Sequence, residues 1–391
     1  MTRLQPPPED QGGAFSGGSL DLGRVVLFSI LLKIAILVLA ALGYRLFTFQ
    51  TQNFLANFHF PPNAGIGIGD AYQTWDAQHY LYLARMGYGP GRMSDAFFPL
   101  YPWLVRGTGL ALGGRFLTAA LLASNLLGTG AVVYLFLLVR PLWGRRTAFY
   151  ACLFLLAFPT AFYMSLPYTE SLFLFLCLGF LFHAQKGQKV RAAVLAFGLP
   201  LARPMGLLIV LAVAVDGWAG RKGKGCLRVN RLLLMAAFAA GAAAYLAFMK
   251  LATGDPMSGF KAQALFASGY LQGGILRPWD WISRNFIHIH YSLNGVGDSL
   301  LNRLGLLAFL AVMTAATRRL PPTWAALGWM LGLAPLSSGN LMSYIRYLDV
   351  VFPLFIYTAD KMKSRPWVYL AAGLPLQALL LLRHTLGFWV G

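Results

Sequence analysis

The stretch that decides the fold class is VVLFSILLKIAILVLAAL, residues Val25–Leu42, an apolar run in which Lys33 is the one charged residue. A helix that crosses the hydrocarbon core of a bilayer needs about 20 mainly apolar residues, so this run predicts a membrane span. It follows Arg24 and lacks an A-x-A cleavage site at its end. We therefore expect an uncleaved anchor rather than a signal peptide that is removed.

Comparable apolar runs recur along the chain, at residues 116–139, 147–164, 168–182, 232–251, 299–316, 323–336, 343–358 and 367–382. Between residues 190 and 215, two shorter apolar pieces are separated by Arg203–Pro204. Proline removes a helical hydrogen bond, so this region predicts two short helices instead of one straight span. They could be re-entrant, because broken backbone at membrane depth is tolerated where it lines a cavity.

The composition of the 391-residue chain agrees with a membrane protein: 58% of the residues are hydrophobic, 12% are charged, and the mean hydropathy is +0.60. Soluble domains carry about 25% charged residues, and disordered chains need the opposite balance. We therefore predict an all-α polytopic membrane protein with roughly 9–12 transmembrane helices. Residues 1–23 predict a disordered cytoplasmic tail, and residues 24–391 predict a single membrane domain. The three cysteines, Cys152, Cys177 and Cys226, have neither disulfide nor metal-site spacing.

The 32 Lys and Arg residues exceed the 13 Asp and Glu residues, which gives a net charge of +19. Positive charge collects in cytoplasmic loops. With a cytoplasmic N-terminus, more than half of the basic residues fall on the cytoplasmic side and most of the acids on the other, provided that 190–215 crosses twice or re-enters. The orientation explains the charge, and no nucleic-acid partner is required. The basic residues on the cytoplasmic side are Arg3, Arg24, Arg140, Arg145, Arg146, Lys186, Lys189, Arg191, Arg221, Lys222, Lys224, Arg228, Arg231, Arg318, Arg319, Lys361, Lys363 and Arg365.

Two connections are long, at about residues 44–115 and 252–298, and both fall on the non-cytoplasmic side. Loops of this length are usually functional or disordered, and their Trp, Tyr, Phe and Pro content argues against disorder. The chain has no internal repeat, which weakens an inverted-repeat transporter as an interpretation.

The first long loop contains DAYQTWDAQHYLYLARMGY, residues Asp70–Tyr88. At helical spacing, Tyr72, Asp76, His79 or Tyr80, and Leu83 share one face. Aromatic residues crowd this stretch, and such side chains sit at headgroup depth, so we expect a helix in the outer interface. Asp76 is then either the solvated acid of an interfacial anchor or a catalytic carboxylate at the membrane surface, and the spacing alone does not decide between them.

Several short motifs in fixed order resemble the PIG-V family, the GPI mannosyltransferase 2 enzymes and their bacterial homologues. The similarity covers roughly residues 75–355, and the first motif is the long and specific one. The matching motifs are Trp75-Asp76-Ala77-Gln78-His79-Tyr80-Leu81, Gly87-Tyr88, Ala96-Phe97-Phe98-Pro99-Leu100-Tyr101-Pro102, Phe158-Pro159, Pro167-Tyr168-Thr169-Glu170-Ser171, Arg203-Pro204 with Gly206, Gly254-Asp255-Pro256 with Phe260 and Gln263, Ser343, Arg346-Tyr347, and Phe352-Pro353.

The resemblance implies a membrane glycosyltransferase of the GT-C type. The sugar donor would be a polyprenyl-phosphate sugar, typically dolichyl-phosphate mannose, used on the non-cytoplasmic face without a cofactor. The acceptor would be a hydroxyl of a glycan or glycolipid. The similarity also places Asp76 at the acidic position of the first outer loop, where GT-C enzymes usually carry the catalytic acid.

Inverting transfer needs a base for the hydroxyl proton and a cation for the departing phosphate. Asp76 is our predicted base. His79, one turn further on, could bind sugar hydroxyls or orient Asp76, or it could be a hydrogen-bonded structural histidine. Glu170 is expected at the outer tip between two spans, as a solvated acid, as a cap of the following helix, or as a second acid of the site.

Arg203 and Arg346 are the predicted phosphate contacts, with Arg346 favoured. An arginine at membrane depth is costly unless it is paired, and for Arg346 an ion pair with Asp349, three residues on, is the alternative. Asp255 is either a turn residue or a substrate contact. The rest of the predicted substrate-binding set consists of Trp75, Tyr80, Gln263 and Tyr347.

His288 and His290 could bind a metal on an extended segment, but no third ligand lies near them in the sequence, so no metal is predicted.

The leading hypothesis is an inverting glycosyltransferase, expected to be a mannosyltransferase. A lipid or glycan transporter and a non-catalytic subunit are the alternatives. The absence of an N-x-Ser/Thr sequon and the compact loops favour a bacterial plasma membrane over an ER membrane. A GPI acceptor is not expected there, which leaves the acceptor and the sugar open.

Overall fold

The computed structural model describes residues 17–218, 226–266, 277–287 and 295–390, and within these ranges all regular structure is helical. The α-helices are α1 (Gly17–Leu46), α2 (Thr51–Asn57), α3 (Asp76–Met86), α4 (Leu100–Ala111), α5 (Phe116–Leu156), α6 (Glu170–Gln185), α7 (Lys189–Ala202), α8 (Ile209–Trp218), α9 (Arg231–Thr253), α10 (Ser258–Ala262), α11 (Pro278–Ile282), α12 (Gly295–Thr317), α13 (Pro322–Leu333), α14 (Tyr344–Tyr347), α15 (Phe352–Met362) and α16 (Pro366–Thr385). The short 3₁₀ and π segments are η2 (Ile68–Tyr72), η3 (Met93–Ala96), η4 (Ala161–Met164), η5 (Pro204–Leu208), η6 (Gln263–Leu265), η8 (Ser283–Ile287), η9 (Ala334–Ser338) and η10 (Leu348–Val350).

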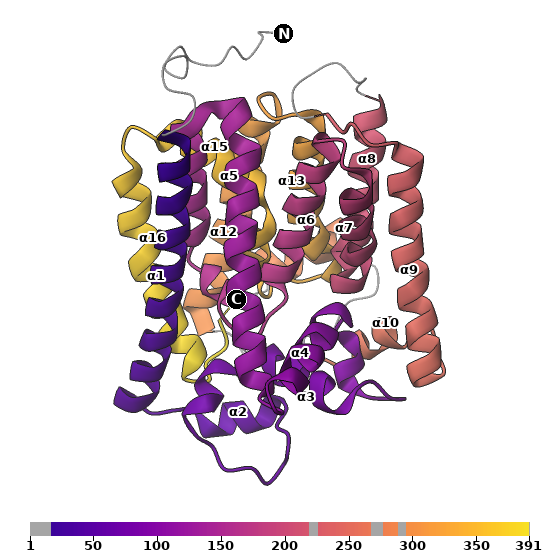
Figure 1. Cartoon of the computed structure of the whole chain (residues 1–391). Helices are drawn as coiled ribbons and strands as arrows, with labels where there is room; N and C mark the ends of the chain where they lie inside the picture. Colours follow the sequence, from indigo (N-terminus) through magenta and orange to yellow (C-terminus); the bar gives the residue numbers. More distant parts are fainter. Residues whose placement is uncertain (1–16, 219–225, 267–276, 288–294, 391) are drawn as a thin grey trace.

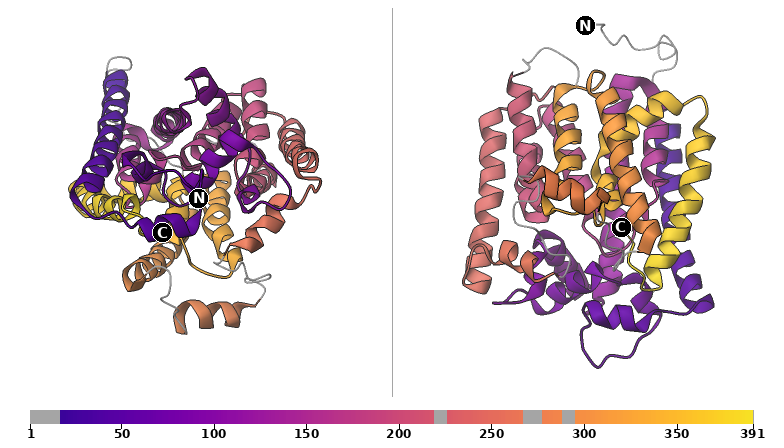
Figure 2. Two further views of the ribbon diagram at one scale, coloured as in Figure 1. Left: turned by 90° about the horizontal axis from the view of Figure 1, so that it is seen from below. Right: turned by 180° about the vertical axis from the view of Figure 1, so that it is seen from behind.

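The helices form a bundle with two distinct ends (Figure 1). We call the end where α1 begins the N-terminal face, and the end that carries α2, α3 and α4 the loop face. Five described helices are long and apolar enough to cross a membrane, namely α1, α5, α9, α12 and α16. The prediction of an all-α polytopic membrane protein is therefore confirmed. Helices α1 and α16 lie side by side at one edge, and α9 lies at the opposite edge (Figures 1 and 2).

Helix α1 begins at Gly17, inside the predicted tail. Residues 17–23 are therefore helical rather than disordered, and residues 1–16 lie outside the described residues. In this first turn Asp21 pairs with Arg145. Residues 1–23 have no apolar periodicity, so the sequence did not indicate that the helix starts at Gly17. The contact between Asp21 and Arg145, a residue far away in the sequence, supports this extension.

Helix α5 reverses direction at Gly144, whose φ of 80° is a left-handed conformation that glycine adopts without strain. Because Arg145, next to this bend, pairs with Asp21 at the start of α1, the reversal lies at the N-terminal face. The two predicted spans 116–139 and 147–164 are thus the two arms of one bent helix. The second arm stops at Leu156, before Phe158–Pro159, since a residue that precedes proline disfavours helical backbone. The prediction of a helix through 164 is wrong in this part.

Several helices are too short to cross a bilayer: α6 has 16 residues, α7 has 14, α8 has 10, α13 has 12 and α15 has 11. At 1.5 Å per residue they are about 15–24 Å long, against about 30 Å of hydrocarbon. Helices α7 and α8 descend from the N-terminal face and return to it, joined by η5 after Arg203 (Figure 1). The predicted break at Arg203–Pro204 into two short helices is confirmed, and re-entry into a membrane stays a prediction.

The predicted span 343–358 is not one helix but the sequence α14, η10 and α15. Pro353 lies in the first turn of α15, where the fixed φ of proline favours a new start and its missing N–H has no cost. Helices α13 and α15 therefore form a second pair that starts and ends at the N-terminal face, and the segment 334–351 turns inside the bundle.

The turn that joins α7 to α8 has no room for a side chain at Gly206. A Cβ built on Gly206 would lie 2.1 Å from the carbonyl oxygen of Leu199. We expect Gly206→Ala to lower the melting temperature in detergent, because a backbone atom cannot rotate away and overpacking costs about 1–3 kcal/mol. Thermal unfolding followed by fluorescence measures this effect.

Gly107→Ala is the matched control, since Gly107 lies within α4 and a Cβ there meets nothing within 4 Å. Alanine is a better helix former than glycine by about 1 kcal/mol, so this change should leave the melting temperature equal or higher. A Gly206→Ala protein as stable as the wild type would contradict the tight turn.

Lys33, the charge within the first span, is buried and donates hydrogen bonds to the carbonyl of Met164 at 2.9 Å and to Ser165 Oγ at 3.5 Å. Ser171 Oγ donates to the same carbonyl at 2.7 Å. These contacts fix the irregular segment between α5 and α6 inside the bundle. A charge at this depth is costly, and the backbone carbonyl offsets part of that cost.

The first long loop is a packed layer under the bundle and not a surface helix. In α3, residues Ala77 to Leu81 are buried, as are Leu83 and Ala84, and α3 packs on α4 and α5. Most side chains of α3 therefore face protein rather than water or lipid headgroups, and its position at the membrane interface stays a prediction. Spacing could not show this, because a short helix rich in aromatic residues suits an interface and a protein core equally well.

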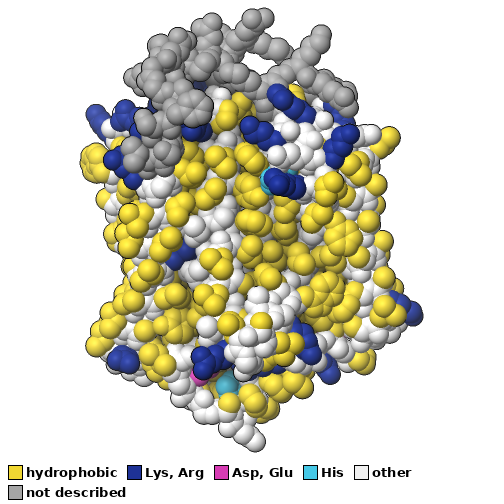
Figure 3. All heavy atoms as spheres, viewed as in Figure 1, with side chains coloured by type: hydrophobic (Ala, Val, Ile, Leu, Met, Phe, Trp, Pro, Cys, Tyr) yellow, Lys and Arg dark blue, Asp and Glu magenta, His cyan; other side chains and the backbone are white. Residues whose placement is uncertain are grey.

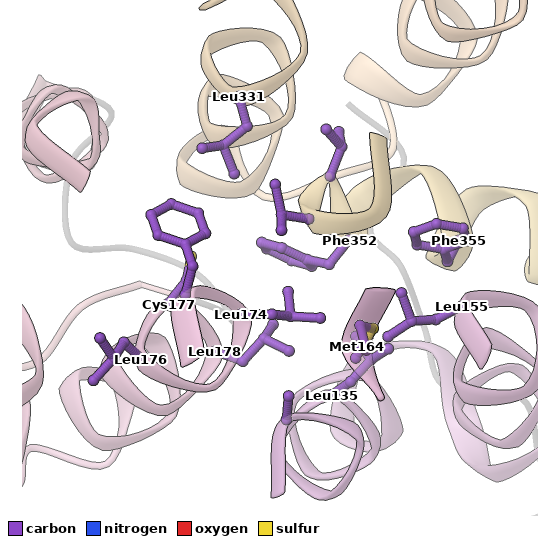
Figure 4. Close-up of a cluster of buried hydrophobic side chains, with 14 of the residues drawn as sticks. Leu135, Leu155, Met164, Leu174, Leu176, Cys177, Leu178, Leu331, Phe352 and Phe355 are labelled. Atoms are coloured by element: carbon purple, nitrogen blue, oxygen red, sulfur yellow. The ribbon is translucent and has the colours of Figure 1, made fainter. Parts of the chain in front are cut away.

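The core lies where α5, α6, α13 and α15 meet. Leu135, Leu155 and Phe355 are among its buried side chains (Figure 4). On the outside, a broad hydrophobic band separates the two faces, and basic side chains gather above it at the N-terminal face (Figure 3). The helix ends on that face carry the basic groups at 140–146, 186–191, 228–231, 318–319 and 361–365.

Candidate active site

Four charged residues from distant parts of the sequence meet in one cluster. Asp76 is the first residue of α3, Glu170 is the first residue of α6, Arg203 joins α7 to η5, and Arg346 lies in α14. Both acids begin helices, where the helix dipole stabilises a negative charge. The inner ends of the short helices therefore bring the charges together above the loop-face layer.

Arg346 joins the two acids. Its Nη1 lies 2.7 Å from Asp76 Oδ2, and its Nε lies 2.7 Å from Glu170 Oε1. Arg203 contacts the same glutamate oxygen through Nη2 at 2.5 Å and donates from Nε to Thr169 Oγ1 at 2.7 Å. We call Asp76, Glu170, Arg203 and Arg346 the charged quartet, and its formal charges sum to zero.

The members of the charged quartet differ in their access to solvent. The Glu170 side chain is 0% exposed, Arg346 6%, Arg203 9% and Asp76 20%. Asp76 is the most accessible member, and its Oδ1 makes no hydrogen bond to the described residues. Glu170 Oε2 and Arg203 Nη1 are buried and have no hydrogen-bond partner among the described residues. The quartet thus combines a reachable carboxylate with a buried guanidinium donor that no group in the described part of the chain uses.

Two tyrosine rings hold the guanidinium of Arg346. Its Cζ lies 4.5 Å from the ring centroids of both Tyr163 and Tyr168. A cation on an aromatic face is stabilised by the quadrupole of the ring, and more so away from water. Tyr168 belongs to the PYTES motif, whereas no sequence signal pointed to Tyr163.

Strained backbone occurs beside both members of the Asp76–Arg346 pair. In the described chain, Trp75 with φ 55° and Ser343 with φ 62° are the two non-glycine residues at positive φ. Trp75 immediately precedes Asp76, and Ser343 immediately precedes α14. Such conformations cost of order 1–3 kcal/mol each and are found where the surroundings determine them, often at functional sites.

Three predicted site residues, His79, Tyr80 and Tyr347, lie close to the quartet, and hydrogen bonds hold the side chains of His79 and Tyr80. His79 is stacked between Phe58 and Phe97 at 4.5 and 4.8 Å, and its Nδ1 bonds Ser94 Oγ at 2.9 Å. Burial lowers the pKa of His79 to about 4, so the ring is neutral at physiological pH. Tyr80 is buried, with its hydroxyl 3.3 Å from Thr169 Oγ1, and Tyr347 is half-buried next to Arg346. The stacking and the bond to Ser94 agree with a structural histidine, whereas the buried Nε2 of His79 has no hydrogen-bond partner among the described residues, so the sugar-binding interpretation stays a prediction.

Trp75 contacts the protein around the start of α3. Its Nε1 donates to the carbonyl of Phe388 at 3.1 Å, its own carbonyl accepts from Asn57 Nδ2 at 3.1 Å, and its ring contacts Trp389 edge to face. These three contacts fix the turn that enters α3.

The second long loop does not bring its predicted residues to the quartet. Asp255 pairs with the exposed Lys261 at 2.6 Å and accepts from the N–H of Met257 at 2.9 Å, as a turn residue does. The hydrogen bond from Lys261 is the main reason why the pKa of Asp255 is lowered. Gln263 begins η6 and is half-buried, and its side chain makes no hydrogen bond to the described residues.

Two further expectations are corrected by the geometry. Glu170 is not at an exposed outer tip but fully buried, because the segment before it folds into the bundle instead of reaching the loop face. Arg346 does not pair with Asp349. That carboxylate accepts from Thr160 Oγ1 at 2.8 Å, since the α14–η10 turn directs the two side chains to different neighbours.

In the described part of the chain, no three His, Cys, Asp or Glu side chains come together as they would to hold a metal ion. His288 and His290 lie outside the described residues. Sequence reasoning missed Thr160, Tyr163 and His384, which complete the surroundings of the quartet. For His384 the one available signal was a histidine near the end of the last apolar run.

No protein-family model matches this sequence. No curated protein matches it either. Solved structures of the oligosaccharyltransferase from Archaeoglobus fulgidus are similar in part. The complex with an inhibitory peptide and a dolichol-phosphate has a TM-score of 0.46 at 12% identity, over 92% of this chain and 56% of that chain. The apo form has a TM-score of 0.46 at 13% identity, over 92% and 56%, and the complex with Zn and sulfate has 0.41 at 14% identity, over 91% and 53%. The chain thus spans a little over half the length of the archaeal enzyme.

Proposed function

We propose that this protein is an inverting membrane glycosyltransferase of the GT-C type. It moves a hexose, expected to be mannose, from a polyprenyl-phosphate sugar to a hydroxyl of a glycan or glycolipid. The observation that carries this proposal is the Asp76–Arg346 pair at 2.7 Å, next to the second arginine Arg203. A base beside two guanidinium groups is the set that this transfer needs.

Asp76 is the general base. It is the most accessible of the four charged residues, and its Oδ1 is available to accept a proton from the attacking hydroxyl. The acceptor oxygen forms a bond to the anomeric carbon, the bond from that carbon to the phosphate oxygen breaks, and polyprenyl phosphate leaves with the negative charge. Positioned proton transfer of this kind contributes about 10²–10⁴-fold to a rate.

Arg346 and Arg203 stabilise the departing phosphate. Arginine donors match phosphate oxygens in geometry and charge. The buried Nη1 of Arg203, which has no hydrogen-bond partner among the described residues, is available for this purpose. Glu170 contacts both arginines and is closed to solvent, so we assign to it the positioning of the two cations and not the second acid role expected from the sequence.

The non-cytoplasmic side of the membrane is the proposed location of the site. The N-terminal face carries the clusters of Lys and Arg at the short connections, which is typical of a cytoplasmic surface. The loop face with Asp76 would then face away from the cytoplasm. Mannose and the bacterial plasma membrane rest on the PIG-V resemblance and on the loop composition described above.

The test is sugar transfer by purified protein in lipid nanodiscs. A panel of polyprenyl-phosphate sugars that differ only in the hexose would be incubated with a mixture of glycan and glycolipid acceptors, and release of polyprenyl phosphate would be measured. We expect one hexose, mannose, to be consumed in an acceptor-dependent way. Transport of an unmodified lipid across the membrane, with no prenol-linked sugar consumed, would contradict the proposal and support the transporter alternative.

A further inference from the structure

A buried histidine links the turn before Asp76 to the rings that hold Arg346. His384, near the end of α16, is 1% exposed. Its Nε2 lies 3.0 Å from Thr74 Oγ1 and 3.2 Å from the Tyr168 hydroxyl, and its Nδ1 lies 3.4 Å from the Tyr163 hydroxyl. Thr74 is two residues before Asp76, and the two tyrosines are those on either side of the Arg346 guanidinium.

The tyrosine hydroxyl protons are already used on the backbone. Tyr168 donates to the carbonyl of Thr74 at 2.8 Å, and Tyr163 donates to the carbonyl of Val390. The Tyr163 oxygen is then left as an acceptor. One neutral tautomer of His384 accounts for two of these three contacts: the Nδ1 proton is donated to Tyr163, and Nε2 accepts from the Thr74 hydroxyl. Tyr168 then touches Nε2 without donating to it and is held through its bond to the Thr74 carbonyl. A side chain fixed through both ring nitrogens is well suited to hold other groups in place.

The chain after His384 contacts the same turn. The carbonyl of Phe388 accepts from Trp75 Nε1 at 3.1 Å. The carbonyl of Leu386 accepts from the N–H of Gln50 at 2.8 Å, which ties the same segment to the residue before α2. Trp75 has a positive φ, so its conformation persists only where its surroundings determine it. The last turn of α16 and the residues that follow it therefore contact two supports of the Asp76–Arg346 pair. One is the strained residue Trp75, and the other is the pair of tyrosine rings beside Arg346.

We propose that His384 is a positioning residue for the transfer reaction: it fixes Thr74 and the two tyrosine rings, and through them the Asp76 carboxylate and the Arg346 guanidinium. This inference rests on the proposed function. His384 itself touches neither acid and neither arginine by hydrogen bond in the described structure, so it acts only through its neighbours.

The experiment is a double-mutant cycle on kcat for sugar transfer. We expect His384→Leu, which removes both ring nitrogens, to lower kcat by about 10- to 100-fold with little change in the KM for the donor, because small displacements of a catalytic pair have effects of that size. His384→Gln, whose amide reaches the Nε2 position, should recover most of this loss. In an Arg346→Lys background, where the planar guanidinium is absent, His384→Leu should cost several-fold less than in the wild type, because only the contribution through Thr74 and Asp76 is left.

Controls separate positioning from folding. His183 is also buried and hydrogen-bonded, to Tyr134 at 3.0 Å, but lies at the N-terminal face, so His183→Leu should leave kcat per folded molecule unchanged. Thr74→Val and Tyr163→Phe each remove one contact of His384, and they replace the leucine variant if that variant does not fold.

An equal loss of kcat on His384→Leu in both backgrounds, or no loss of kcat, would overturn the positioning role alone. A wild-type protein that consumes no prenol-linked sugar would overturn the proposed function together with this inference.

Discussion

Asp76→Asn is expected to lower kcat for sugar transfer by about 10²–10⁴-fold, the usual contribution of a general base. Asparagine has the same shape, and its carbonyl oxygen still accepts a hydrogen bond from Arg346, which now lies 2.7 Å from Asp76 Oδ2. The amide cannot take a proton at neutral pH. Donor binding, measured by competition with unreactive polyprenyl phosphate, should therefore change far less than the rate.

Asp255→Asn is the matched control for this prediction. Asp255 also pairs with a cation, Lys261 at 2.6 Å, but it lies outside the charged quartet and its side chain is 37% exposed. Exposed ion pairs are worth little, so both transfer and stability should stay near the wild-type values. If Asp76→Asn and Asp255→Asn had the same small effect on kcat, Asp76 would not be the base.

Glu170→Gln should have the largest effect on stability. Glu170 Oε1 contacts Arg203 at 2.5 Å and Arg346 at 2.7 Å, and its side chain is 0% exposed. Removing one partner of a buried ion pair leaves charge without compensation and costs about 3–5 kcal/mol. We expect a strong fall in the melting temperature in detergent and in the yield of monodisperse protein, with loss of transfer as a consequence.

Asp349→Asn tests whether this effect depends on the arginines. Asp349 is equally buried, but in the described structure its carboxylate accepts a hydrogen bond from the Thr160 hydroxyl at 2.8 Å and does not pair with a cation. An amide replaces that acceptor, so the melting temperature should change by much less than in Glu170→Gln. Equal destabilisation by the two variants would indicate that the loss of any buried carboxylate is harmful, and that Glu170 has no special pairing role.

Composition and apolar runs were sufficient to predict an all-helical membrane protein, and the Arg203–Pro204 break was sufficient to predict the α7–α8 pair. Both rest on local chemistry: the length of a run and the hydrogen bond that proline lacks. Motif order also brought Asp76, Glu170, Arg203 and Arg346 into one set of candidates. Their pairing was not predictable, because each contact joins residues that are far apart in the sequence and depends on where the short helices end.

The same limit explains the wrong predictions. Burial of α3 depends on its packing against α4 and α5, and burial of Glu170 depends on the path of residues 157–169, which Lys33 holds from another helix. The position of His384 near the end of the last apolar run did not indicate its contacts, since its partners Thr74, Tyr163 and Tyr168 lie more than 200 positions away along the chain. Spacing rules describe one element at a time and do not extend to such contacts.

The cancelling charges of the quartet have a consequence for the end of the reaction. A lipid phosphodiester carries one negative charge, whereas the phosphate monoester released from it carries about 1.5 to 2 at neutral pH. In the proposed reaction, Asp76 would lose its own charge on taking up the proton of the acceptor, and Arg346, which is bonded to Asp76 in this structure, would be free to turn to the phosphate. The arginine would thus exchange one anionic partner for another, so that no uncompensated charge forms in a region of low dielectric. Return of Asp76 to its ionised form would then draw the arginine back and favour dissociation of the spent carrier.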